Sequence, residues 1–289
     1  MADSKTYLIA NHRFRVVGDH EVELLRTMAG FPVFEVEDGD AEWQVVFGCG
    51  IERPAQWEDL YDFSFEEVVM DSMFAKTDEA YYYIMEPHDK TVPPMLMRYA
   101  GGNTVEATYC HDAMMLRFAL WMALSMMSAS SKMLLVHSST IVHQGKAVLF
   151  LGESGTGKST HTRLWLKYIP DSHLLNDDCP VLAVEKGEAV VYGSPWSGKT
   201  HCYHQLRFPL AAAVRLSQAP YNKIHKLSVV ESFSSLHPSC PPALAQDDRY
   251  QDYMLDMLSD VLSTVPVFHL ECLPDEAAAW TSHDAIFKS

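Results

Sequence analysis

The segment that most constrains the fold is an apolar run followed by a glycine-rich turn and a helix pattern, at residues 146–169. It reads KAVLFLGESGTGKSTHTRLWLKYI. AVLFL is typical of a strand buried on both faces, and GESGTG supplies glycines where a backbone must approach a ligand closely. Pro170 ends the helix pattern. Residues 152–159 satisfy the Walker A pattern G-x-x-x-x-G-K-[ST], so the segment predicts an α/β unit with an anion-binding loop.

This loop predicts a nucleotide site. We expect backbone amides of residues 154–158 to surround the β-phosphate, Lys158 to reach the β and γ oxygens, and the Ser159 hydroxyl to bind Mg²⁺. The predicted cofactors are therefore ATP and Mg²⁺, and pyrophosphate stays open as an alternative donor. The alternative is a glycine-rich turn with no ligand. The predicted nucleotide-binding residues are Gly152, Ser154, Gly155, Thr156, Gly157, Lys158, Ser159 and Thr160.

A second octet, GSPWSGKT at residues 193–200, matches the same pattern. Its context differs, because Pro195 has no N–H to give and Trp196 is bulky. The residues that follow, THCYHQLRFPL, do not read as a helix. Lys158 is therefore predicted to serve the nucleotide, and the second octet to form an acceptor-side loop. There Trp196 would form an apolar wall and Lys199 would contact the γ-phosphate or an anionic acceptor; the alternative is an ordinary turn with an exposed lysine.

An acidic pair and a histidine flank the loop in sequence. Asp177 and Asp178 follow a short apolar step in SHLLNDDCPVL, and His137 lies in LLVHSSTIVH before the loop. Phosphoryl transfer to an alcohol needs one carboxylate near the metal and one base near the acceptor proton. Adjacent residues at a strand end point in different directions and can divide these tasks. The alternatives are a solvated Asp-Asp turn and a structural histidine.

His137, the strand AVLFLG, the loop GESGTGKST and the pair Asp177-Asp178 resemble HPr kinase/phosphorylase in their order and approximate spacing. A more distant likeness is to phosphoenolpyruvate carboxykinase. The resemblance covers roughly residues 133–200, with weaker support from PVFHLECLPDEAA near the end. It implies a P-loop kinase domain, His137 with Asp177 as an acid/base pair, and Asp178 with Ser159 on the metal. The predicted catalytic residues are thus Asp177, His137 and Lys158.

The chain departs from that family in one region. The glycine-rich E-I-R-G-x-G type of segment that meets the protein substrate is not found, and PWSGKTH stands there instead. We therefore expect a kinase with another hydroxyl acceptor: a small molecule, a peptide or a protein serine. A nucleotide-binding regulatory protein that transfers nothing is the first alternative, and a carboxykinase-like enzyme is the second.

Composition narrows the partners and the location. The net charge of −16 over 289 residues disfavours nucleic acid and anionic membranes, which attract positive surfaces. The start shows no apolar signal core, and the apolar run at 113–127 is expected to be too short to span a bilayer. A cytoplasmic protein is expected, with homo-oligomerisation left open.

The sequence predicts an α/β (α+β) chain with a β-rich region at 1–110 and a P-loop kinase-like domain at 111–289. Helices are expected at 19–30, with Asp19 as N-cap, at 112–130, at 160–169, at 249–265 and around 274–280. No structure is assigned to 57–76. Strands are expected at 7–10, 12–18, 31–37, 43–49, 81–87, 95–102, 105–109, 133–143, 146–152, 179–184, 189–193 and 266–272.

Overall fold

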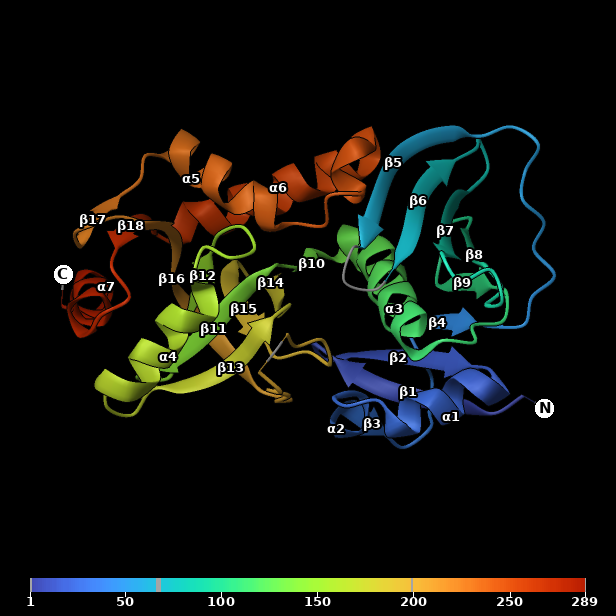
Figure 1. Ribbon diagram of the computed structural model, residues 1–289, viewed down its shortest axis with the longest axis horizontal. Helices are drawn as coiled ribbons and strands as arrows, with labels where there is room; N and C mark the ends of the chain where they lie inside the picture. The colour runs from blue at the N-terminus through green and yellow to red at the C-terminus, as the bar shows by residue number, and fades with distance from the viewer. Residues whose placement is uncertain (1, 66–68, 199, 289) are drawn as a thin grey trace. The chain divides into compact units, whose positions relative to one another are not determined.

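The computed structural model describes residues 2–65, 69–198 and 200–288 (Figure 1). Contacts between residues divide the chain into two compact units. One is Met1–Ala129 with Ala243–Gln251, and the other is Ser130–Pro242 with Asp252–Ser289. Each has a mixed sheet and helices of its own, so the chain is of the mixed α/β class. The division at residue 111 stays a prediction; contacts place the helix that follows it in the first unit.

The first unit is built on a mixed sheet with the strand order β3-β1-β2-β4-β9-β8-β7-β6-β5. The pairs β2–β4 and β4–β9 are parallel, and the other neighbours are antiparallel. Its strands are β1 (Ser4–Ile9), β2 (His12–Val17), β3 (Glu35–Val36), β4 (Trp43–Val46), β5 (Glu58–Phe65), β6 (Met70–Lys76), β7 (Tyr81–Pro87), β8 (Met95–Tyr99) and β9 (Thr104–Ala107). Its helices are α1 (Asp19–Thr27), α2 (Phe31–Phe34) and α3 (Ala113–Ser128), and the segment Ala243–Gln251 holds the 3-10 turn η3 (Leu244–Gln246).

Three local predictions in this unit are wrong. The acidic stretch left without structure forms the hairpin β5–β6, where Met70 and Phe74 point inward from alternate positions of β6 and are buried. Residues 31–34, predicted as the start of a strand, form a helical turn. Pro32 is compatible with this turn because it lies in the first turn of the helix, where proline is tolerated. The N-cap of α1 is Gly18 rather than Asp19, whose carboxylate accepts instead from the backbone N–H of Asp3.

Helix α3 begins where the sequence predicts. The Asp112 carboxylate accepts hydrogen bonds from the N–H groups of Met114 and Met115 at 2.8 and 2.9 Å, which is N-cap geometry. With the 3-10 turn η1 (Ala129–Ser131), the stretch is 19 residues long and apolar enough to cross a membrane by length and composition. The expectation that it is too short is therefore wrong. However, 67% of its apolar window is buried inside the protein, as in a core helix.

The second unit holds a mixed sheet with the order β10-β14-β15-β16-β12-β11-β13, and β18 pairs with both β16 and β17. Its strands are β10 (Met133–Leu135), β11 (Ser138–His143), β12 (Lys146–Leu151), β13 (His173–Asp178), β14 (Val181–Glu185), β15 (Glu188–Tyr192), β16 (Arg207–Gln218), β17 (Lys223–Lys226) and β18 (Val267–Cys272). Its helices are α4 (Lys158–Tyr168), α5 (Val229–Leu236), most of α6 (Asp248–Thr264) and α7 (Glu276–Phe287), with the 3-10 turn η2 (His237–Ser239).

Strand direction brings four strand ends to one edge of this sheet. β12, β16 and β18 are parallel neighbours. β13 runs in the direction of β12, since both are antiparallel to β11. The carboxyl ends of β12, β13, β16 and β18 therefore share an edge, and the opposed strand β11 begins there. In open α/β sheets, the edge formed by the strands' carboxyl ends is where ligands bind.

Helices α4 and α7 contact each other and the strands of this sheet. Trp165 of α4 is fully buried against Phe150 of β12, in a cluster that also contains Val214 of β16. Burying side chains of this size stabilises the unit by roughly 1.5–3 kcal/mol each. This packing fixes α4 against the strand that precedes it, and so fixes the loop between them.

The second unit differs from the sequence reading in several elements, and strand β17 and helix α5 are among those not predicted. The predicted strand 133–143 is broken into β10 and β11, with Val136 and His137 between them. The twelve-residue strand β16 was not predicted. Its alanine-rich centre has low strand propensity, and Pro209 looked like a stop. Pro209 instead lies where β16 pairs with β15, opposite Val190.

Candidate active site

The first octet lies between β12 and α4. Gly152 follows the last residue of β12, and Ser154, Gly155 and Thr156 form an exposed to half-exposed turn. Gly157 is the N-cap of α4 with φ 106°, a left-handed conformation in which a larger residue would be strained. Lys158, Ser159 and Thr160 open the helix. The unpaired N–H groups of this helix start make it suited to an anion.

The Lys158 side chain turns back onto the loop. Its Nζ donates to the carbonyl oxygens of Gly152 and Glu153, at 2.7 and 3.1 Å, and lies 2.9 Å from Nε2 of His137. These three contacts match the three hydrogen-bond donors of an ammonium group. Burial lowers the pKa of Lys158, and the charge of Asp178 opposes that shift. The ammonium is held by neutral acceptors.

His137 links Lys158 to the acidic pair. Because Lys158 has only donors to offer, Nε2 of His137 accepts, and Nδ1–H faces Asp178 Oδ1 at 3.2 Å. The ring is thereby set in the tautomer that carries its proton on Nδ1. The backbone N–H of His137 donates to Ser239 at 2.7 Å. The observed partner is Asp178, whereas the resemblance pairs His137 with Asp177.

Asp177 has a different environment. It is 5% exposed, and its Oδ1 accepts from the Ser139 hydroxyl at 2.6 Å. Ser139 also lies 3.1 Å from the hydroxyl of Thr162 on α4. Sequence reasoning missed Ser139, since only the pairing of β11 with β13 sets it opposite Asp177. The two aspartates thus meet different groups: a buried hydroxyl at Asp177, and a half-exposed imidazole at Asp178.

The second octet lies against the aspartate pair. It follows β15, and the described residues after it, 200–206, form no helix. Gly198 N–H donates to the carbonyl of Asp177 at 3.3 Å, and Ser197 forms a β-bridge with Asp178. A Cβ on Gly198 would lie 2.8 Å from that carbonyl oxygen, so only glycine fits without a shift. Lys199, the predicted contact to phosphate or acceptor, lies outside the described residues.

Trp196 is 3% exposed, so its ring has little surface left to contact an acceptor. Its carbonyl accepts from Nδ2 of Asn176 at 2.9 Å. Asn176 is fully buried, and its Oδ1 accepts from the N–H groups of Asp178 and Cys179 at 3.0 and 2.8 Å. One buried amide therefore ties the second octet to the turn after β13. A lone Asn before Asp-Asp gave no signal of this in the sequence.

The end of β16 adds two more residues that the sequence reading missed. Arg215 lies opposite Leu151 in the β12–β16 pairing, and its Nη2 is 3.3 Å from Glu153 Oε1. The Nε2 of Gln218 donates to the carbonyl of Gly155 at 3.2 Å. The signal was the polar residues of RLSQ after an apolar run. It was missed because β16 itself was not predicted.

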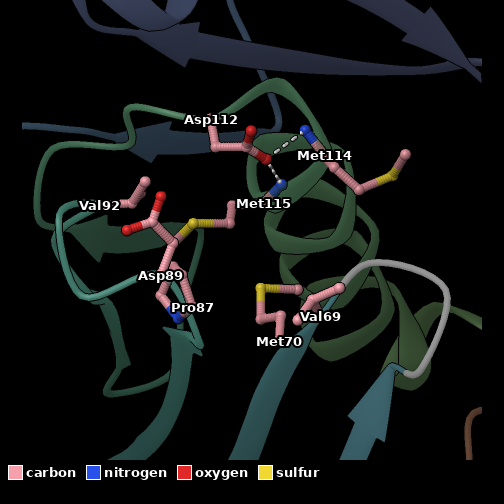
Figure 2. Close-up of a pocket in the computed structure, with 8 residues that line it drawn as sticks. All are labelled: Val69, Met70, Pro87, Asp89, Val92, Asp112, Met114 and Met115. Atoms are coloured by element: carbon pink, nitrogen blue, oxygen red, sulfur yellow. Dashed lines mark hydrogen bonds between the residues drawn. The ribbon is translucent and has the colours of Figure 1, made fainter.

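A cavity of about 700 Å³ borders the loop between the ends of β16 and β18. A second cavity, of about 540 Å³, lies in the first unit and is lined by Met70, Met114 and Met115 among others (Figure 2). The two carboxylates that line this cavity accept hydrogen bonds from residues near them in sequence. Asp112 caps α3, and Asp89 accepts from the N–H and hydroxyl of Thr91. The first-unit cavity therefore shows no group set for catalysis among its described residues.

Comparison with known proteins gives little beyond this. No family model matches the sequence, and no curated protein matches it. Among solved structures, the Hpr(Ser) kinase/phosphatase from Coxiella burnetii is similar over 54% of this chain and 99% of its own. The identity is 10% and the TM-score 0.31, so the relation is distant. Any conclusion about function therefore rests on the residues and their geometry.

Proposed function

We propose that this chain is an ATP-dependent kinase that transfers the γ-phosphoryl group to a hydroxyl of a small molecule, a peptide or a protein serine. The observation that carries the proposal is the convergence of Lys158, His137 and Asp178 at the end of a glycine-rich loop. A helix N-terminus, an ammonium and a carboxylate are the groups that phosphoryl transfer requires in one place.

In this proposal the loop amides and Lys158 hold the phosphates. Lys158 exchanges its hydrogen bonds to the carbonyls of Gly152 and Glu153 for bonds to phosphate oxygens. The barrier to transfer falls because the ammonium stabilises the negative charge that shifts onto the phosphate oxygens in the transition state. Arg215 is a second cation beside the loop, paired with the exposed Glu153. It can turn to the same phosphates at little cost, since an exposed ion pair contributes about 0–1 kcal/mol.

Hydroxyl and carboxylate oxygens are the ligands that Mg²⁺ prefers, so Ser159 and Asp178 fit that ion and would hold it together with the phosphates. When bound, Mg²⁺ would neutralise charge on the transferred group. His137 orients Asp178 through Nδ1–H. Asp177 takes the proton of the acceptor hydroxyl, with Ser139 fixing its carboxylate.

The position of Gly198 against Asp177 supports an acceptor-side role for the second octet. A loop that touches the proposed base reaches the volume that an acceptor must enter. The roles of Trp196 and Lys199 stay predictions.

The test is transfer from γ-labelled ATP to candidate hydroxyl acceptors. We expect Lys158→Ala to abolish transfer and Asp177→Asn to lower kcat by a factor of at least about 100, the scale of general-base catalysis. Unchanged kcat in Asp177→Asn would remove that residue from the mechanism. Stabilisation by ATP with no transfer to any acceptor would instead identify a regulatory nucleotide-binding protein.

A further inference from the structure

The loop has two chemically distinct sides. On one side lie Lys158, His137 and Asp178, with His137 contacting both the Lys158 ammonium and the Asp178 carboxylate. On the other side is the 700 Å³ cavity, whose lining begins with Gly155, Gly157 and Thr160 and continues onto the ends of β16 and β18. The two sides therefore give a bound nucleotide a direction along the loop.

The described residues that line the cavity include no Asp, Glu, Lys or Arg. Leu164, Leu216 and Leu273 supply its apolar surface. Burial keeps its two titratable groups neutral, since it lowers the pKa of His161 to about 4 and raises the pKa of Cys272 to about 11. Phosphates would find no counter-charge here, whereas an aromatic base would find apolar contact. The volume lies within the 300–1,000 Å³ that is usual for small-molecule sites.

Gln218 is the polar residue best placed to read a ligand. Its Nε2 is committed to the carbonyl of Gly155, which can only accept. That bond fixes which end of the amide faces the loop and leaves Oε1 as an acceptor, on a residue that lines the cavity. Adenine has an exocyclic amine that donates at position 6, while hypoxanthine carries an oxygen there.

We infer that the cavity beside the loop binds the purine and ribose of the nucleotide, and that Gln218 Oε1 accepts a hydrogen bond from the amine of adenine. This rests on the proposed function, since it places the triphosphate on the loop. It also specifies that the phosphoryl donor is a purine nucleotide, because a pyrophosphate donor would leave the cavity unused. The γ-phosphate then lies on the Lys158 side and the base on the Leu273 side.

The experiment is calorimetric titration of the full chain with MgATP, MgITP and magnesium tripolyphosphate. Tripolyphosphate probes the loop alone, ATP probes loop and cavity, and ITP lacks the amine. We expect ATP to bind more tightly than both. Leu273→Ala and Gln218→Leu should each weaken ATP about fivefold or more, from lost apolar contact and a lost hydrogen bond respectively. Leu273→Ala should leave tripolyphosphate binding unchanged. Gln218 also bonds to Gly155 of the loop, so Gln218→Leu is judged by its ratio of ATP affinity to ITP affinity.

Leu166→Ala is the matched control, because Leu166 is an exposed leucine of α4 that does not line the cavity. Gln218 is exposed at a strand end, so its replacement leaves the core intact. In Gln218→Leu the preference for ATP over ITP should vanish.

Equal binding of ATP and tripolyphosphate to the wild-type chain, both lost in Lys158→Ala, would overturn the base site while leaving the phosphate loop standing. Equal binding of ATP and ITP to the wild-type chain would overturn the role of Gln218. If none of the three binds, the proposed kinase function fails, and the nucleoside site fails with it.

Discussion

Replacing Asn176 with alanine tests whether one buried amide holds the second octet to the aspartate pair. Asn176 is fully buried and bonds to the N–H of Asp178, the N–H of Cys179 and the carbonyl of Trp196, at 3.0, 2.8 and 2.9 Å. The alanine variant removes the amide and leaves these three backbone groups behind. The perturbation is therefore confined to one network.

The expected loss of stability follows from what is left unpaired. A buried donor or acceptor without a partner costs about 1–3 kcal/mol. The Asp178 side chain is 37% exposed, whereas Cys179 and Trp196 are buried. The Trp196 carbonyl keeps the Ser194 hydroxyl as a donor at 3.0 Å, so the buried N–H of Cys179 is the group left unpaired. The expected loss is about 1–3 kcal/mol in the free energy of unfolding of the second unit.

Urea unfolding measures this loss, and hydrogen exchange of peptides from 173–206 shows where it falls. We expect a lower midpoint at unchanged slope, with faster exchange in those peptides before global unfolding. Asn103→Ala is the matched control, since Asn103 is exposed in a turn, and it should stay within about 0.5 kcal/mol of wild type. A loss below about 1 kcal/mol in Asn176→Ala would refute the reasoning.

Three further predictions concern other contacts. Gly198→Ala places a Cβ 2.8 Å from the carbonyl oxygen of Asp177. The variant should lower kcat about tenfold or more and keep its ATP affinity, since a misplacement near 1 Å costs up to about 100-fold in rate. An unchanged kcat would count against an acceptor-side loop. Burial holds the pKa of His161 at about 4, below its unfolded value, so the unfolded chain binds the proton first and stability falls as pH drops from about 6.5 towards 4. His161→Gln should remove roughly 3 kcal/mol of that dependence in urea titrations. A variant whose stability changes with pH in parallel with wild type would contradict this. Asp247 is 3% exposed and accepts from Lys76 at 3.0 Å, so Asp247→Ala should destabilise the first unit by about 3 kcal/mol, and a thermal midpoint equal to wild type would argue against this.

Local periodicity was enough to predict the elements around the loop. The apolar run before Gly152 is β12, and the i,i+4 apolar pairs after Ser159 lie in α4. The sequence also indicated which octet is followed by a helix. Both results depend on neighbours in sequence, where residue preferences act directly.

Contacts between distant segments could not be predicted in this way. Ser139 meets Asp177 only through the register of β11 with β13, and Arg215 reaches the loop only because β16 pairs parallel to β12. The pairing of His137 with Asp178 depends on the break between β10 and β11. A shift of one residue in register would turn each of these side chains to the other face.

The division of the first unit into Met1–Ala129 and Ala243–Gln251 affects how the chain folds as it is synthesised. Asp247, the partner of Lys76 and Tyr81, is made only after most of the second unit. Domains that are continuous in sequence can fold in the order of their synthesis. Here the amino-terminal unit cannot complete its contacts until a late segment is synthesised. The Lys76 ammonium and the Tyr81 hydroxyl lack the Asp247 carboxylate until the ribosome has passed that residue. Chaperones that bind the growing chain thus meet a first unit that still lacks one of its segments, although the loop of the second unit has already been synthesised.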